Sequence, residues 1–478
     1  MERTGLEREF SDGPPAPGRH PARCGESCPG RCSGAHCSVP SPGRYGPLTP
    51  SRRIRCARWR PRPSPTRDAH QATTVGTRRF AQRAPDRGAA FRATIPRRLT
   101  ASALGLGTYL GDCTNEDDAA YATVVREALG AGVNLFDTAI NYRCQRSERT
   151  LGHALVEAIA SGAVRRDELI VCTKGGYVAL EGAPPASRDE YEQYLERELY
   201  APGILARDDL VRGGHSISPT FLSYQLARSR TNLGLRAVDV YYVHNPEEQL
   251  LAVDRGTFNE RVRAAFAMLE ARASAGEIAG YGCATWTGFR VGPEHRQHLS
   301  LAELVALARD VAGTAHHFRA VQLPLSLAMP EAARVATQPL GRKLVPLLDA
   351  ADALGIGVVA SAPLMQGRLT SGLPEEMHAH FPGCSTDAQR ALRFTASLPG
   401  VSAVLAGMRT TQHLEENLGA WTECDGCMRT LAPRAFRVAR DQAHARPSSR
   451  GSPAAQPFVT RELEWTLPAA CRRPFALP

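Results

Sequence analysis

The sequence predicts an α/β protein of the (β/α)8 class, a TIM barrel, flanked by two tails without regular structure. From Ala103 to Trp421, eight apolar segments typical of strands alternate with amphipathic segments typical of helices. No GxGxxG motif follows any of these strands, which argues against a doubly wound open sheet, the structural alternative. We therefore expect a parallel barrel with its helices outside.

The expected elements follow one another in strict alternation. The first strand, ALGLGTYL, ends in a loop at residues 107–109, and an N-cap pair, Thr114 and Asp117, then opens a helix that ends near Gly132. The next strands are VNLFD, ELIVCTK, AVDVYYVHN, IAGYGCAT, AVQLPLS, GVVASAP and VSAVLAG. The helices between and after them are SERTLGHALVEAIASG, SPTFLSYQLARSRTNLG, RVRAAFAMLEARASAG, LAELVALARDVAG, LVPLLDAADALG, DAQRALRFTASL and TQHLEENLGAW.

The two tails differ in composition from the expected barrel, residues 99–421. Residues 1–98 are rich in Arg, Pro, Gly and Ser and are expected to be disordered, and residues 422–478 form an irregular C-terminal tail. The first hundred residues hold 20 Arg and seven acidic residues, a charge of +13, whereas the whole chain carries +10. The basic character therefore belongs to the N-terminal tail, and we expect no nucleic-acid binding by the barrel.

The cysteines predict no metal site. Cys24, Cys28, Cys32 and Cys37, with His36 among them, match no zinc or iron–sulfur spacing, and Cys424 and Cys427 form a lone CxxC. Single cysteines in the barrel are typical of free thiols in a reducing cytoplasm: Cys113, Cys144, Cys172, Cys283 and Cys384. No apolar run approaches the roughly 20 residues of a membrane span, and the N-terminus lacks the apolar core of a signal peptide. A cytoplasmic protein that is not bound to a membrane is expected.

Reactive side chains stand at the carboxyl ends of three consecutive strands. Asp137 ends the second strand and Tyr142 follows it on a loop, while Lys174 ends the third strand and His244 the fourth. Taken alone, a capping Asp and a partly buried Tyr would explain the first pair. In a barrel, however, these strand ends meet at the face where active sites lie. Lys174 is one of only two lysines, with Lys343, which favours a role for a compact ammonium whose pKa can shift.

These residues lie in segments that resemble the aldo-keto reductase family. The matching segments, between Leu104 and Trp421, are GLGTYLG, NLFDTAINY, SERTLGHAL, TKGG, VHNP, PLMQGRLTSG and GMRTTQHLEEN. The resemblance implies reduction of an aldehyde, ketone or sugar with a nicotinamide cofactor, usually NADPH, bound extended across the barrel mouth. It also implies that the catalytic tetrad is Asp137, Tyr142, Lys174 and His244.

The implied roles agree with the chemistry of these groups. A free Tyr titrates near 10, so Tyr142 is a weak acid until an ammonium stabilises its phenolate. Lys174, held by Asp137, would do so. His244 would orient the substrate carbonyl or share the proton while hydride passes to the carbonyl carbon.

The resemblance also implies a set of cofactor-binding residues: Thr108, Tyr109, Asp137, Gln322, Ser361, Leu364, Gly367, Arg409, His413 and Asn417. Gln322 would hold the nicotinamide carboxamide, and Arg409 would neutralise a 2′-phosphate, which favours NADPH over NADH. Three residues depart from the family pattern. Ala284 and Thr285 replace a common Ser–Asn pair, and Ser361 stands where many members stack a Tyr on the nicotinamide ring, so weaker or altered stacking is expected.

Three functions compete on this sequence. The first is an NADP(H)-dependent reductase or dehydrogenase acting on a small carbonyl or alcohol, and the second is an NADPH-binding barrel that reports redox state to a partner. The third, a metal-dependent hydrolase, lacks clustered His and Asp ligands at the strand ends. The long segment 175–219 lies on the active face and shapes a substrate pocket or forms a solvated surface. Substrate, direction and oligomeric state are not determined by the sequence.

Overall fold

A closed barrel of eight parallel strands forms the centre of the chain, which confirms the expected fold class. The computed structural model describes residues 70–83, 91–94 and 99–421. Around the barrel the strand order is β11-β12-β3-β4-β5-β6-β7-β8. The strands are β3 Leu104–Gly107, β4 Leu135–Asp137, β5 Ile170–Gly175, β6 Val238–His244, β7 Ile278–Ala284, β8 Phe318–Pro324, β11 Gly357–Ser361 and β12 Val401–Gly407. The expectations for Cys24 to Cys37 and for Cys424 and Cys427 lie outside the described residues.

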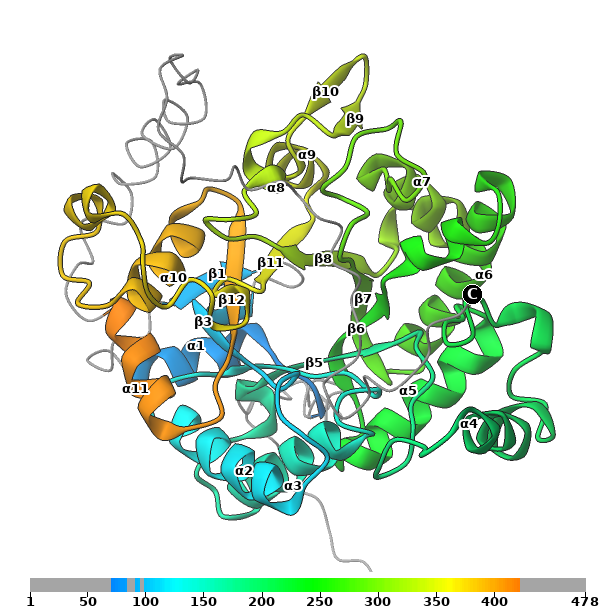
Figure 1. The fold of residues 1–478 in the computed structure, drawn as a ribbon, viewed down its shortest axis with the longest axis horizontal. Helices are drawn as coiled ribbons and strands as arrows, with labels where there is room; N and C mark the ends of the chain where they lie inside the picture. The colour runs from blue at the N-terminus through cyan, green and yellow to red at the C-terminus, as the bar shows by residue number, and fades with distance from the viewer. Residues whose placement is uncertain (1–69, 84–90, 95–98, 422–478) are drawn as a thin grey trace, which may run out of the picture. The chain divides into compact units, whose positions relative to one another are not determined.

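Helices form a ring around these strands (Figure 1). They are α2 Asn115–Gly130, α3 Arg146–Ala160, α5 Pro219–Leu233, α6 Arg255–Ser274, α7 Leu301–Ala312, α9 Leu347–Leu354, α10 Asp387–Ser397 and α11 Thr411–Leu418. The expected cap holds, because the Thr114 side chain accepts a hydrogen bond from Asp117 N at the start of α2. None of the helices in the described ranges is long and apolar enough to cross a membrane.

Two apolar clusters follow from the alternation of side chains along the strands. Phe136, Val171 and Tyr241 face outward and pack with the helices in the larger cluster. Leu135 and Tyr242, on the opposite face of their strands, belong to the smaller cluster inside the barrel. Both faces of each strand are therefore buried, which explains their nearly continuous apolar sequences.

The expectation that residues 1–98 lack regular structure is wrong for two segments. Helix α1, Thr74–Arg83, and strand β1, Phe91–Thr94, are formed, and β1 pairs antiparallel with β2, Leu99–Ser102. Phe80 of α1 joins the outer core cluster, and Arg79 binds Asp167 and Glu168 just before β5. Phe80 is the one large apolar residue of α1 that is buried, so its sequence gives little sign of a core-facing side. Its ion pairs and tertiary contacts supply the stability that its sequence pattern does not show.

The segment between β5 and α5 is a small substructure of its own. It contains α4 Arg188–Leu195, the π-helical turn η3 Glu196–Tyr200 and the 3-10 turn η4 Arg207–Asp209. Leu195, Leu199 and Leu205 pack with Phe221 in a separate cluster. This packing shows that the segment is folded, and it lies beyond the carboxyl end of β5.

A short hairpin changes one helix boundary. Strands β9, Gln338–Leu340, and β10, Lys343–Val345, pair antiparallel, so the helix expected from Leu344 begins instead at Leu347. The remaining short elements are α8 Glu331–Arg334, η2 Arg166–Glu168, η5 Pro246–Leu251, η6 Gly313–Ala315, η7 Met365–Gly367, η8 Glu375–His380 and η9 Gly419–Trp421.

Candidate active site

Neighbouring strands bring Asp137 and Lys174 into direct contact at the carboxyl end of the barrel. Asp137 ends β4 and is 4% exposed, while Lys174 lies in the adjacent β5 and is 1% exposed. The ammonium of Lys174 forms an ion pair with Asp137 Oδ1 and donates a 2.8 Å hydrogen bond to the carbonyl oxygen of Thr138. A buried carboxylate at the end of an apolar strand thus has the partner that its burial requires.

The second carboxylate oxygen of Asp137 is also bound. Gln322 Nε2, from β8, donates to Asp137 Oδ2 at 2.8 Å across the barrel mouth. Burial raises the pKa of Asp137, and Lys174 and Gln322 oppose that shift. Burial acts to lower the pKa of Lys174, but Asp137 and Tyr142 together outweigh it and the net shift of the pKa is upward. Lys174 therefore remains an ammonium held in place by Asp137.

Tyr142 lies over this ion pair. Its ring centroid is 4.9 Å from Lys174 Nζ, and Lys174 is also a hydrogen-bond partner of the phenol. The ring makes edge contacts with Tyr109 at 5.0 Å and with His244 at 5.8 Å. Burial raises the pKa of Tyr142, and the Lys174 ammonium only partly offsets this. The net direction differs from the expected lowering, because Asp137 neutralises much of the charge of Lys174, and the phenol stays protonated.

His244 is packed between two tyrosines, one of which the sequence did not identify. Its ring lies 5.8 Å from that of Tyr142 and 5.1 Å from that of Tyr177, which belongs to the segment after β5. Burial, and then the charge of Lys174, holds the pKa of His244 well below its usual value. The imidazole is therefore neutral, and its Nδ1 is buried without a hydrogen-bond partner in the described part of the chain.

His215 contacts the backbone of His244, and the sequence did not identify this residue either. Its Nε2 lies 2.8 Å from the carbonyl oxygen of His244, and its Nδ1 lies 2.8 Å from Gln249 Nε2. The two partners require a neutral ring that donates from Nε2 and accepts at Nδ1, in agreement with burial lowering the pKa of His215 to about 4. Tyr177 and His215 lie in a long loop without a periodic pattern, so no spacing in the sequence linked them to His244.

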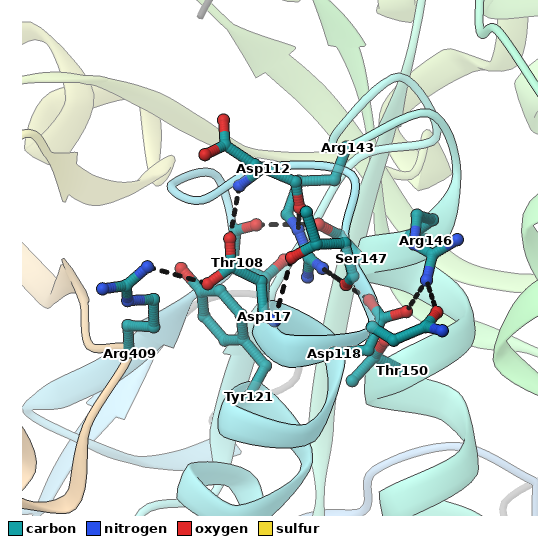
Figure 2. A network of polar contacts seen from close by, with 12 residues as sticks. Thr108, Asp112, Asp117, Asp118, Tyr121, Arg143, Arg146, Ser147, Thr150 and Arg409 are labelled. Atoms are coloured by element: carbon teal, nitrogen blue, oxygen red, sulfur yellow. Dashed lines mark hydrogen bonds and ion pairs between the residues drawn. The ribbon is translucent and has the colours of Figure 1, made fainter. Parts of the chain in front are cut away.

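A strained turn follows Tyr142. Arg143, Cys144 and Gln145 have φ values of 47°, 52° and 70°, a left-handed conformation that non-glycine residues seldom adopt. The side chain of Arg143 holds the turn by donating to the carbonyl oxygen of Asp112 at 2.8 Å and pairing with Asp118 (Figure 2). Arg146 pairs with the same Asp118. These contacts tie the Tyr142 loop to the start of α2.

The residues expected to bind a cofactor lie along the mouth formed by β3, β8, β11 and β12. Thr108 N and Oγ1 donate to the carbonyl oxygen of Asp137 at 3.1 and 3.3 Å, and Tyr109 contacts Tyr142. Ser361 ends β11, Leu364 and Gly367 follow it at η7, and Asn417 is buried in α11 whereas His413 is exposed. Arg409 is 54% exposed and its Nη1 lies 2.8 Å from Asp117 Oδ1 (Figure 2).

Unpaired buried groups near Gln322 fit the amide end of a nicotinamide. Thr285 Oγ1 is buried without a hydrogen-bond partner within the described ranges, as is His244 Nδ1. Thr285 N donates to the carbonyl oxygen of Gln322 at 2.8 Å, so the two residues are adjacent at the ends of β7 and β8. Buried polar atoms of this kind normally have partners. A carboxamide, which both donates and accepts hydrogen bonds, matches the chemistry of these groups.

Comparisons with known proteins point to one family of oxidoreductases. The family model described as Aldo/keto reductase family matches residues 103–292. L-glyceraldehyde 3-phosphate reductase of Escherichia coli (strain K12) is 26% identical over 360 residues, covering 68% of this chain and 84% of that protein. D-threo-aldose 1-dehydrogenase of Pseudomonas sp is 32% identical over 132 residues, so the match spans 27% of this chain and only 35% of that relative.

Among solved structures, the holo form of an aldo-keto reductase from Bacillus halodurans is similar, with 17% identity and a TM-score of 0.49 over 73% of this chain and 96% of that one. Asp137, Tyr142, Lys174 and His244 all lie within the range 103–292 that the family model matches. Residues 103–292 match the aldo-keto reductase family, whose members are oxidoreductases that interconvert carbonyls and alcohols.

Proposed function

We propose that this protein is an NADP(H)-dependent oxidoreductase that reduces an aldehyde, ketone or sugar, with Tyr142 as the proton donor. The observation that carries the proposal is the buried Asp137–Lys174 ion pair with the ring of Tyr142 over it, beside the neutral ring of His244. The names of the relatives, an aldose dehydrogenase and a glyceraldehyde 3-phosphate reductase, make sugars and small phosphorylated aldehydes the first substrates to test.

Each group has a separate role in this proposal. When bound, the nicotinamide supplies hydride to the carbonyl carbon. Negative charge then develops on the carbonyl oxygen, and the protonated phenol of Tyr142 transfers its proton to that oxygen. Lys174, fixed by Asp137, stabilises the phenolate that remains. The neutral ring of His244 serves as a hydrogen-bond donor that orients the carbonyl.

The preference for NADP(H) rests on Arg409. Its guanidinium is half exposed at the start of α11, and one of its nitrogens pairs with Asp117. The other nitrogens of the guanidinium can bind a 2′-phosphate, which Arg does with charge-assisted hydrogen bonds. Gly367 has a φ of 90° and no atoms within 4 Å of where a Cβ would lie, which suits a backbone that approaches a pyrophosphate.

The alternative, an NADPH-binding redox sensor, does not need a proton donor. The contact of Lys174 with both Asp137 and Tyr142 therefore favours turnover. The test uses the purified full chain with NADPH and a panel of aldehydes, ketones and sugars, and follows loss of reduced nicotinamide. Turnover that Tyr142→Phe abolishes supports the proposal. NADPH binding without turnover on any carbonyl supports the sensor, and absence of NADPH binding refutes both.

A further inference from the structure

Two cysteines lie in contact beside the Tyr142 loop, and neither has a role in the proposed reaction. Cys113, in the loop between β3 and α2, is partly exposed, whereas Cys144 is 5% exposed and stands two residues after Tyr142. Arg143, next to Cys144, donates to the carbonyl oxygens of Asp112 and Thr114, on either side of Cys113, at 2.8 and 3.4 Å. The two loops are therefore side by side, and the Cys113 and Cys144 side chains interact. The sequence placed both among scattered free thiols, because 30 residues separate them and only the meeting of the two loops brings them together.

The surroundings of this pair favour a thiolate. The hydrogen bond from Cys144, followed by the charges of Arg143 and Arg146, lowers the pKa of the Cys113 thiol to about 7, against the effect of burial. Arg143 is 5% exposed and its Nη1 is buried without a hydrogen-bond partner in the part of the chain that the structure describes. A buried guanidinium with a free donor stabilises an anion beside it.

Other cysteines of the barrel lie in the opposite environment. Burial raises the pKa of Cys172 well above its ordinary value and also raises that of Cys283. Both are buried in strands β5 and β7. Because the thiolate is the reactive form, these two thiols are inert and serve as internal controls for Cys113.

We propose that Cys113 and Cys144 are a hydroperoxide-reactive dithiol that closes to a disulfide and thereby slows turnover. The Cys113 thiolate attacks one oxygen of hydrogen peroxide, the O–O bond breaks, and the departing hydroxide takes a proton to become water. The Cys144 thiol then loses its proton and attacks the sulfur of the Cys113 sulfenic acid. An S–S bond forms, the S–O bond breaks, and the second hydroxide leaves as water after taking up that proton. Two thiols thus supply the two electrons that reduce the peroxide.

The strained turn transmits this change to Tyr142. A disulfide requires the two sulfurs to approach to about 2.05 Å, which is closer than thiols in hydrogen-bond contact. Cys144 is the central residue of the left-handed turn, and Asp112, the neighbour of Cys113, accepts a hydrogen bond from Arg143. The two loops therefore shift together. A displacement of about 1 Å at a catalytic group costs about a hundredfold in rate, and we expect a loss of that order.

The test treats the full chain with hydrogen peroxide and maps its peptides by mass spectrometry. The expected product is a Cys113–Cys144 cross-linked peptide, with Cys172 and Cys283 still reduced. Turnover should fall about a hundredfold and return after treatment with dithiothreitol. The cross-link is read by mass, so it tests the dithiol even if the proposed reductase activity is wrong.

Two variants separate the steps. Cys113→Ser removes the partly exposed thiol, should keep its basal activity, and should resist peroxide. Cys144→Ser retains the attacking thiolate but not the resolving thiol, so Cys113 should accumulate as a sulfenic acid that dimedone traps. If Cys144→Ser does not fold, the peroxide resistance of Cys113→Ser alone tests the proposal. A Cys113→Ser enzyme inactivated as fast as the wild type, or a peptide map with Cys113 no more oxidised than Cys172, overturns the proposal.

Discussion

Replacement of Tyr142 by Phe isolates the proposed proton transfer from packing. The ring contacts with Tyr109, His244 and Lys174 involve the face and edges of the aromatic ring, which Phe keeps. Only the hydroxyl group is lost. General acid catalysis contributes about a hundredfold or more, which corresponds to about 2.7 kcal/mol of transition-state stabilisation. We expect that loss in the hydride-transfer step, with NADPH affinity and thermal stability nearly unchanged.

Lys174 tests whether Tyr142 and its neighbour act as one unit. Lys174→Met leaves the buried carboxylate of Asp137 without its cation, so the free energy of unfolding should fall by about 3–5 kcal/mol as well. Lys174→Arg keeps a positive charge, but a planar fork does not fit between Asp137 and the phenol, and this variant should be almost as inactive. Lys343→Met is the matched control, because Lys343 is the other lysine and is exposed in β10.

Single-turnover kinetics under saturating NADPH, with an active carbonyl substrate, measure these effects. The double variant of Tyr142→Phe with Lys174→Met should react little more slowly than the slower single variant, since the two residues serve one proton transfer. Urea unfolding curves separate the loss of stability from the loss of rate. A Tyr142→Phe enzyme that transfers hydride at the wild-type rate would refute the role of Tyr142, and fully additive losses would refute the coupling to Lys174.

Three further predictions concern the cofactor, the N-terminal helix and a buried acid. Arg409→Gln should weaken NADPH binding by about 1 kcal/mol and leave NADH binding unchanged. The loss is at the low end for a charge-assisted contact because Asp117 already pairs with Arg409. Calorimetric titration, with Arg309→Gln as the control, measures this, and equal losses for both cofactors would contradict it. Deletion of residues 1–69 should leave thermal stability unaltered. Deletion of residues 1–98 removes α1 and should lower the free energy of unfolding in urea by about 3 kcal/mol or more, since Phe80 is buried and α1 supplies ion pairs to Glu168. Equal stability of the two truncated proteins would argue against this role of α1. Burial raises the pKa of Glu247 from 4.5 to about 7, so the folded state holds a proton that the unfolded state releases, and stability is lost as pH rises from about 5 to 8. Glu247→Gln should abolish that pH dependence and should be about 3 kcal/mol more stable than the wild type at pH 8. If thermal unfolding shows a stability difference that does not change with pH, Glu247 does not titrate in this range.

The barrel and the positions of Asp137, Lys174 and His244 at the carboxyl ends of its strands were predictable from local patterns alone. Continuous apolar strands separated by amphipathic helices require parallel pairing, and a closed parallel barrel places every strand end on one face. The contact of Lys174 with Asp137 follows from that topology, because β4 and β5 are neighbours, Asp137 ends β4 and Lys174 is the last residue but one of β5. No side chain beyond the strand ends was needed to predict it.

Tertiary structure alone decided the features that depend on contacts between distant segments or on the balance of burial against charge. Helix α1 is stabilised by partners that lie about 90 residues later, so its own sequence shows no period. His215 and Tyr177 reach His244 only through the fold of a long loop. The pKa of Tyr142 is raised because the effect of burial exceeds that of the Lys174 charge, which Asp137 neutralises. The contact of Cys113 with Cys144 depends on a left-handed turn. Periodicity records which face of an element is buried, but it carries no information on which distant groups meet there.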